Sequence, residues 1–198
     1  MGTNIGIVLF DGVEELDFVG PWEVFGMAAQ IRDDVHVGTL ARSADPVRCA
    51  KGLQVVPDRR MSPGLEIDVL LVPGGQGTRR AVEDPAMIDW LRAVAQRCSW
   101  VTSVCTGALL LCEAGLAGAR RVTTHWSFVE SLHKRYPDTE VLDGVRYVRD
   151  GNLVTAAGVS AGIDMALWLA GQLWGVETAR QIQRLMQYDP APPYTADV

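Results

Sequence analysis

Residues 99–111 read SWVTSVCTGALLL, and this stretch decides the fold. β-branched and apolar residues lead directly into Cys105, and a leucine run follows Thr106 and Gly107. An apolar strand without polar alternation is typical of a parallel sheet that is covered on both faces. The stretch therefore predicts a buried strand at 100–104, a sharp turn at Cys105 and a buried helix over 106–114.

The alternation of strand and helix patterns extends along the whole chain. Strand-like runs lie at 5–10, 35–40, 53–56, 67–72, 100–104 and 122–124, and a hairpin is expected over 141–155. Helical spacing covers 18–29, 85–97, 106–114, 127–135, 161–173 and 177–186, and the proline-rich tail 189–198 reads as extended. This order predicts one α/β domain over 1–198, with a doubly wound, mostly parallel sheet and helices on both faces.

Local signals refine three of these elements. Pro21 is expected in the first turn of its helix, where the missing N–H costs little. Asp84 followed by Pro85 is a typical helix start. The run at 53–56 is expected at a sheet edge because Pro57 ends it.

Composition narrows the class of protein. The 198 residues are 48% hydrophobic and 21% charged, and the net charge is −6. No run of Lys or Arg favours nucleic acid or a membrane surface, and no apolar stretch approaches the roughly 20 residues that span a bilayer. The N-terminus reads as a first strand rather than a signal peptide. Four cysteines without CxxC pairs favour free thiols, a cytoplasmic location and no metal site.

Three strand ends carry residues suited to chemistry, and a parallel sheet brings such ends to one edge. The central one holds Cys105, on a tight strand-to-helix turn of the kind that presents a nucleophile. An adjacent helix N-terminus is expected to lower a thiol pKa from about 8.5 to ~3.5–7.5, which favours the nucleophilic thiolate. The other two ends hold PGGQG at 73–77 and the acids that follow Phe10.

The residues around Cys105 have expected roles of their own. The Gly75 and Thr106 amides are expected to form an oxyanion-hole-type pair. One acid of the segment GVEELD is expected beside the thiol; Leu16 and Phe18 favour Asp17, while Glu14 and Glu15 stay open. His125 could reach the same edge, and three scattered histidines do not make a metal site.

The sequence resembles the ThiJ/PfpI superfamily, which has the flavodoxin-like, class I glutamine-amidotransferase-like fold. The stretches that carry the resemblance are IGIVLFDGVEELDFVGPWEVF, DVLLVPGGQGT, VTSVCTGALLLCEAGLAGARRVTTHW and LVTAAGVSAGIDMAL, which together span nearly the whole chain. Within the superfamily it is most similar to the isocyanide hydratases, by the threonine after the cysteine, by LD with GPWEVF, and by the closing QYDPAPPY.

This resemblance implies a lyase without a cofactor that converts small isocyanides to N-substituted formamides. It implies Cys105 as the nucleophile, Asp17 as the acid that contacts it, Thr106 as the neighbouring hydroxyl and amide, and Gly75 as the strand-end glycine. It also implies a homodimer. Thr106 stands where the peptidase-like branch has histidine, which argues against peptidase activity. The chain ends soon after its last helix, which argues against a DNA-binding module.

Two other functions stay open. A reactive thiol with an acid also suits glyoxalase-like chemistry on small dicarbonyls. A non-enzymatic redox or ligand sensor would instead use oxidation of an accessible, low-pKa Cys105. The aromatic residues Trp22, Trp126 and Trp168 are candidates for a pocket or an interface, and core packing is the alternative.

Overall fold

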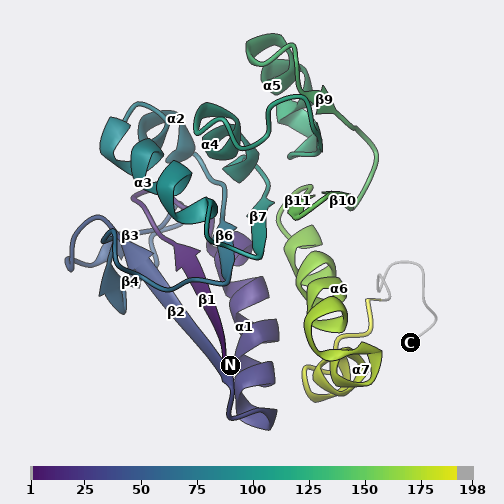
Figure 1. The fold of residues 1–198 in the computed structure, drawn as a ribbon. Helices are drawn as coiled ribbons and strands as arrows, with labels where there is room; N and C mark the ends of the chain where they lie inside the picture. The colour runs from purple at the N-terminus through teal and green to yellow at the C-terminus, as the bar shows by residue number, and fades with distance from the viewer. Residues whose placement is uncertain (1, 191–198) are drawn as a thin grey trace.

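Seven strands form the central sheet of the computed structural model, which describes residues 2–190 (Figure 1). The strand order is β10-β11-β7-β6-β1-β2-β5, and every neighbouring pair is parallel except β10 with β11. The strands are β1 (Thr3–Val8), β2 (Val35–Ala41), β5 (Arg59–Arg60), β6 (Val69–Val72), β7 (Trp100–Val104), β10 (Tyr147–Asp150) and β11 (Leu153–Ala156). This order confirms the mostly parallel, flavodoxin-like sheet.

Helices cover both faces of this sheet, as predicted (Figure 1). One group, whose members contact one another, is α1 (Glu15–Ile31), α6 (Ala161–Trp174) and α7 (Val176–Leu185). The second group is α2 (Thr78–Ala81), α3 (Pro85–Ala95) and α4 (Gly107–Glu113). The short helix η1 (Trp126–Phe128) and α5 (Val129–Arg135) follow α4. The apolar runs are buried because both faces are covered; every residue of β6 is buried, for example.

The start of α3 shows how local sequence sets an element. The Asp84 carboxylate accepts hydrogen bonds from the backbone N–H groups of Ala86 (3.0 Å) and Met87 (3.3 Å), and Pro85 occupies the first helical position. These bonds satisfy two of the N–H groups that a helix start leaves unpaired. The predicted capping is confirmed.

Three predicted boundaries are wrong. α1 begins at Glu15, three residues earlier than expected, so Pro21 lies in its second turn and leaves the Asp17 carbonyl without its helical N–H donor. The run at 53–56 forms only β4 (Gln54–Val55), which pairs with β3 (Val47–Arg48) in a separate ribbon rather than at the edge of the main sheet.

The third error concerns the hairpin. It begins at Tyr147 rather than at 141, because β9 (Glu140–Val141) pairs in parallel with β8 (Arg121–Val122) instead. The predicted strand at 122–124 is therefore this short β8. Most of the predicted extended tail, residues 191–198, lies outside the described residues.

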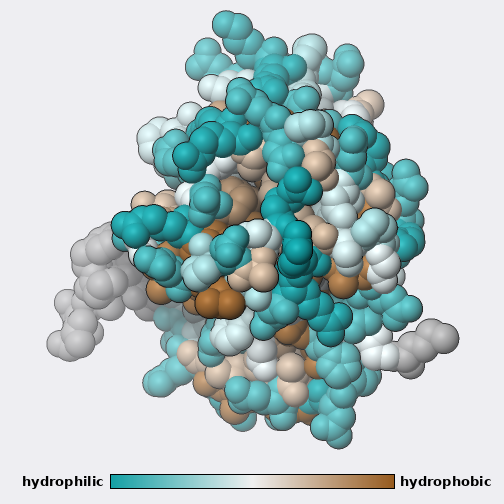
Figure 2. All heavy atoms as spheres, turned by 90° about the vertical axis from the view of Figure 1, so that its left-hand side faces the viewer, coloured by the Kyte–Doolittle hydropathy of each residue, from teal (hydrophilic) through white to brown (hydrophobic). Residues whose placement is uncertain are grey.

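The helices show whether this part of the chain has a membrane-spanning segment, and the surface shows where hydrophobic side chains gather. Over residues 2–190, no helix is both long and apolar enough to cross a membrane. The face that carries the β3–β4 ribbon is mainly hydrophilic, with hydrophobic side chains visible in a hollow near its middle (Figure 2).

The sheet order fixes where a site can form. β1 has β2 on one side and β6 on the other, so the chain direction across the sheet reverses beside β1. Open α/β sheets bind ligands at the carboxyl ends of strands next to such a reversal. The loops that follow β1, β6 and β7 meet there.

Candidate active site

Cys105 lies at the turn between β7 and α4, with a backbone φ of 55°. This left-handed conformation is strained for a residue with a side chain. Hydrogen bonds hold it: the Cys105 N–H donates to the carbonyl oxygens of Ala156 (3.0 Å) and Ala157 (2.7 Å), and the Thr124 hydroxyl donates to the Cys105 carbonyl (2.8 Å). The strained turn predicted for the nucleophile is therefore present, and 7% of the residue is exposed.

Asp17 is the acid that points into the protein, and 0% of it is exposed. Its Oδ2 accepts a hydrogen bond from the Gly74 N–H (2.9 Å), and its carboxyl lies close enough to the Cys105 thiol for each group to affect the pKa of the other. Oδ1 is buried and accepts no well-aligned hydrogen bond from the described residues. Burial raises the pKa of Asp17 from 3.8 to about 7, against the lowering effect of the Gly74 N–H.

The pKa of the Cys105 thiol is raised, which corrects the expected lowering. Burial is the main cause and the neighbouring Asp17 carboxylate adds to it, bringing the pKa to about 12. The amide and hydroxyl of Thr106 and the Val159 amide lie near the sulfur and lower the pKa, against the effect of burial. Burial and a like charge therefore outweigh the start of α4, a helix of two turns. At neutral pH the thiol is therefore protonated.

Thr106 and Gly75 are paired with each other, which corrects the expected oxyanion arrangement. The Gly75 N–H donates to the Thr106 hydroxyl oxygen (3.0 Å), and the hydroxyl lies 3.2 Å from the Gly75 carbonyl oxygen. The Thr106 amide faces the Cys105 sulfur. The Gly75 amide is therefore occupied, and its role is to orient the Thr106 hydroxyl.

The close approach of the two loops requires glycine. A Cβ built on Gly74 would lie 2.5 Å from the Thr106 nitrogen and 2.9 Å from Asp17 Oδ2. A Cβ on Gly107 would lie 2.0 Å from the Val72 carbonyl oxygen. Real Cβ contacts are never this short, so both positions keep the β6 and β7 loops in contact.

Glu14 and Glu15, the other two acids of the segment, turn toward Lys51. The Lys51 ammonium forms an ion pair with Glu14 and lies 3.8 Å from Glu15 Oε2, and the Lys51 backbone N–H donates to Glu15 Oε1 (2.7 Å). Glu14 raises the pKa of Asp17 and Lys51 lowers it. These groups adjust the charge around Asp17 but are not the acid at the sulfur.

His125 lies beside the site without a hydrogen bond to Cys105. Its Nδ1 is 2.8 Å from the Ser127 hydroxyl oxygen, and its ring packs against Gly158. With the exposed Trp126 and with Val159 it lines a cavity of about 380 Å³. Because the Val159 amide also faces the Cys105 sulfur, this cavity borders the Cys105 thiol.

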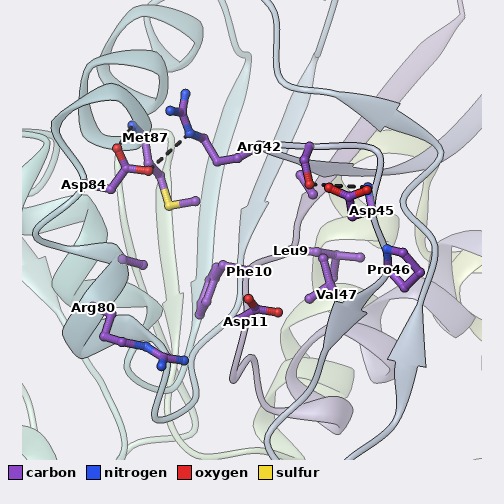
Figure 3. Close-up of a pocket in the computed structure, with 14 residues that line it drawn as sticks. Leu9, Phe10, Asp11, Arg42, Asp45, Pro46, Val47, Arg80, Asp84 and Met87 are labelled. Carbon is purple, nitrogen blue, oxygen red and sulfur yellow. Dashed lines mark hydrogen bonds and ion pairs between the residues drawn. The ribbon is translucent and has the colours of Figure 1, made fainter.

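A larger cleft of about 410 Å³ lies elsewhere, between the end of β1 and α2 (Figure 3). Its lining includes Phe10, Asp11, Arg42 and Arg80, but neither Cys105 nor Asp17. An ion pair between Arg42 and Asp84 (3.2 Å) crosses its upper wall (Figure 3). Size alone does not place the chemistry in this cleft.

Two residues of the site were missed from the sequence. Arg79 places its guanidinium 3.4 Å from the Thr106 hydroxyl oxygen, and Val159 has a strained φ of 41° beside the sulfur. No motif marks either of them; the neighbouring glycines of PGGQG were the only signal for Arg79. Within residues 2–190 no group of three or more His, Cys, Asp or Glu could hold a metal ion.

A strained cysteine over a flavodoxin-like sheet, with a buried acid from the first helix, defines a class of proteins. The model of the DJ-1/PfpI family matches residues 3–172, and the chain belongs to that family. It superposes on a ThiJ/PfpI family protein from Pseudomonas syringae with a TM-score of 0.88 and 32% sequence identity, covering 100% of this chain and 80% of the other.

Two relatives of known description show how varied the functions are. The chain is 41% identical to isonitrile hydratase from Pseudomonas putida, over 98% of this chain and 82% of that protein. It is 31% identical to the HTH-type transcriptional regulator CdhR from Pseudomonas aeruginosa, over 92% of this chain and 54% of that protein. The similarity to an enzyme is thus the greater in both identity and extent.

Proposed function

We propose that the protein is an isocyanide hydratase, which adds water to small organic isocyanides and releases N-substituted formamides. The observation that carries the proposal is the contact between the strained Cys105 and the buried Asp17, whose pKa of about 7 suits proton transfer near neutral pH. The 41% identity to an isonitrile hydratase supports it.

In the first step the Cys105 sulfur attacks the terminal carbon of the isocyanide. Asp17 takes the thiol proton as the carbon–sulfur bond forms and returns it to the same carbon, which gives a thioimidate. The unpartnered Oδ1 is the oxygen available for this transfer. Because the thiol pKa is about 12, a base that acts during the attack is needed.

In the second step water attacks the thioimidate carbon. Asp17 takes one proton from the water and delivers it to the substrate nitrogen. The new hydroxyl then gives up its proton through Asp17 to the sulfur as the carbon–sulfur bond breaks, which releases the formamide and the thiol. The sum is isocyanide plus water to formamide. The Thr106 amide faces the sulfur and stabilises negative charge on it, while the Thr106 hydroxyl donates to the Gly75 carbonyl oxygen (3.2 Å).

The test is formamide production from a simple alkyl or aryl isocyanide by wild type, Cys105→Ala and Asp17→Asn. We expect loss of turnover in Cys105→Ala and a turnover rate lower by about 10²–10⁴-fold in Asp17→Asn, which is the usual contribution of general acid–base catalysis. Cys98→Ala removes another buried thiol, away from the site, and is expected to keep activity.

The alternatives give different results in the same experiment. Lactate from methylglyoxal, without formamide from isocyanides, would favour glyoxalase-like chemistry. No turnover with selective oxidation of Cys105 would favour a sensor.

The four free thiols support our further proposal that the protein works in the reducing cytoplasm.

A further inference from the structure

Arg79 holds a guanidinium directly above the residue that follows the nucleophile. Its Nη1 donates to the Gly75 carbonyl (3.2 Å), the Thr78 hydroxyl (3.1 Å) and the Thr106 hydroxyl (3.4 Å). The guanidinium carbon also lies 4.6 Å from the centre of the Phe128 ring, a cation–π distance. Contacts with α2, the β6 loop, the β7 turn and η1 therefore fix an exposed arginine in one place.

The charge of Arg79 has no partner within residues 2–190. No carboxylate forms an ion pair with it, and its Nε and Nη2 donate no hydrogen bond. The acids nearest the thiol are already engaged: Glu14 pairs with Lys51, and Asp17 accepts from Gly74. The free edge of a guanidinium is a fork of N–H donors that matches a carboxylate.

We propose that Arg79 forms an anion subsite at the mouth of the Cys105 site and selects substrates that carry a carboxylate near the reacting carbon. The choice of substrate rests on the proposed function: an isocyanide hydratase with this anion subsite prefers short isocyano-carboxylates. Thr106 accepts a hydrogen bond from Nη1 and Phe128 covers one face of the guanidinium, so the unoccupied donors receive the substrate carboxylate. The isocyanide carbon then lies toward Cys105.

The first test does not depend on the reaction. Iodoacetate and iodoacetamide both alkylate a thiolate with loss of iodide and differ in charge, so the ratio of their rates at Cys105 reports anion capture and cancels the thiolate fraction. We expect Arg79→Ala to lower the ratio of iodoacetate to iodoacetamide about fivefold, the upper range for an exposed ion pair, with partial recovery in Arg79→Lys. Adduct formation at Cys105 is followed by mass spectrometry.

Arg80→Ala is the matched control, because it removes the same charge from the next residue. The Arg80 guanidinium lies in the cleft of Figure 3 rather than over Thr106, and it has no hydrogen bond to the site. The ratio is expected to stay at the wild-type value in this variant. An equal decrease in both variants would show only a general field of positive charge and would overturn the subsite, as would an unchanged ratio in Arg79→Ala.

The second test uses substrate. Isocyanoacetate and its ethyl ester are compared by kcat/KM in wild type, Arg79→Ala and Arg80→Ala. We expect wild type to prefer the anion, Arg79→Ala to lose that preference through a higher KM for the anion, and Arg80→Ala to keep the wild-type preference. If no isocyanide reacts, the proposed function fails and the alkylation ratio still decides the anion subsite. If both compounds react equally well in wild type, the subsite proposal fails and the hydratase stands.

Discussion

Asp17 and Cys105 are two weak acids in the same buried site, and the protonation state of one affects the pKa of the other. The carboxyl has a pKa near 7 and the thiol a pKa near 12, both raised mainly by burial. Ionised Asp17 raises the thiol pKa further, so a thiolate forms most easily when the carboxyl holds the proton. Transfer between the two groups keeps one negative charge in the site throughout, which is the arrangement that proton relay requires.

Replacing Asp17 by asparagine is expected to change how stability depends on pH. The folded pKa of about 7 exceeds the ordinary value of 3.8, so wild-type stability falls as the pH rises from about 4 to about 7. The asparagine side chain keeps an acceptor for the Gly74 N–H but never ionises. The free energy of unfolding of the variant, relative to wild type, should therefore rise with pH by up to about 4 kcal/mol.

Urea unfolding of both proteins at pH 4.5, 6 and 8 measures this difference. Glu23→Gln is the control, since Glu23 lies on the same helix but is not among the groups that act on Asp17. A constant difference between Asp17→Asn and wild type at all three values would mean that Asp17 is not buried as a protonated acid.

Gly74→Ala is expected to abolish activity, because the new methyl group would meet the Thr106 backbone at 2.5 Å rather than a side chain that could move. Separating the two loops should also cost about 1–3 kcal/mol of stability. Gly64→Ala places the same methyl group where no atom lies within 4 Å and should leave turnover unchanged. Turnover assays with thermal melts compare the two, and an active Gly74→Ala would contradict the loop contact.

The sequence could locate this site but not complete it. Cys105, Asp17 and Thr106 were named because a strand end, a hydrophobic flank and a family pattern each leave a local trace. The hydrogen bond from the Gly75 amide to Thr106 depends on the direction in which one N–H points between two loops. The position of Arg79 depends on a helix of a single turn. Neither leaves a pattern along the chain. The predicted lowering of the thiol pKa was wrong because burial, which has the larger effect, depends on the tertiary structure.

At the level of elements, burial explains which predictions held. The strands β6 and β7 are buried almost throughout because both faces of the sheet are covered, and the runs 67–72 and 100–104 located both of them. Strands of two residues were missed or misassigned, because β5 consists of two exposed arginines and β4 pairs with β3 through contacts that no periodicity encodes.

The packing of α1 predicts opposite effects for two of its glycines. A Cβ on Gly26 meets no atom within 4 Å, so Gly26→Ala should stabilise the protein by about 0.5–1 kcal/mol through helix propensity. A Cβ on Gly20 would lie 2.8 Å from Ile163 of α6, so Gly20→Ala should destabilise it by about 1–3 kcal/mol. Chemical denaturation measures both. Equal effects would show that α1 and α6 do not cross closely at Gly20.

At the scale of the whole molecule, the doubly wound order gathers the site from segments that are far apart in sequence. Asp17 comes from α1, Cys105 from the turn after β7, and Gly74 from the loop after β6. Each is a strand end or the helix after it, and all converge where the sheet reverses direction. The sheet therefore brings distant segments to one edge, where hydrogen bonds from Gly74 to Asp17 and from Gly75 to Thr106 join them.

The same helix that supplies Asp17 leaves apolar side chains uncovered, which underlies the proposal of a homodimer. Leu16 is 38% exposed and Trp22 is 43% exposed, and exposed aromatic side chains are typical of subunit interfaces. Light scattering coupled to gel filtration should give twice the chain mass of 21.5 kDa.

Trp22→Lys should shift that mass toward the monomer, because it places a charge in the interface. Ala93→Lys puts the same charge on the exposed face of α3, on the other side of the sheet, and should leave the mass unchanged. A monomeric wild type, or a dimer that survives Trp22→Lys, would show that this part of α1 faces solvent. Since Leu16 is adjacent to Asp17, a dimer that covers it would also limit the access of water to the acid. Loss of the dimer should then lower turnover together with the mass.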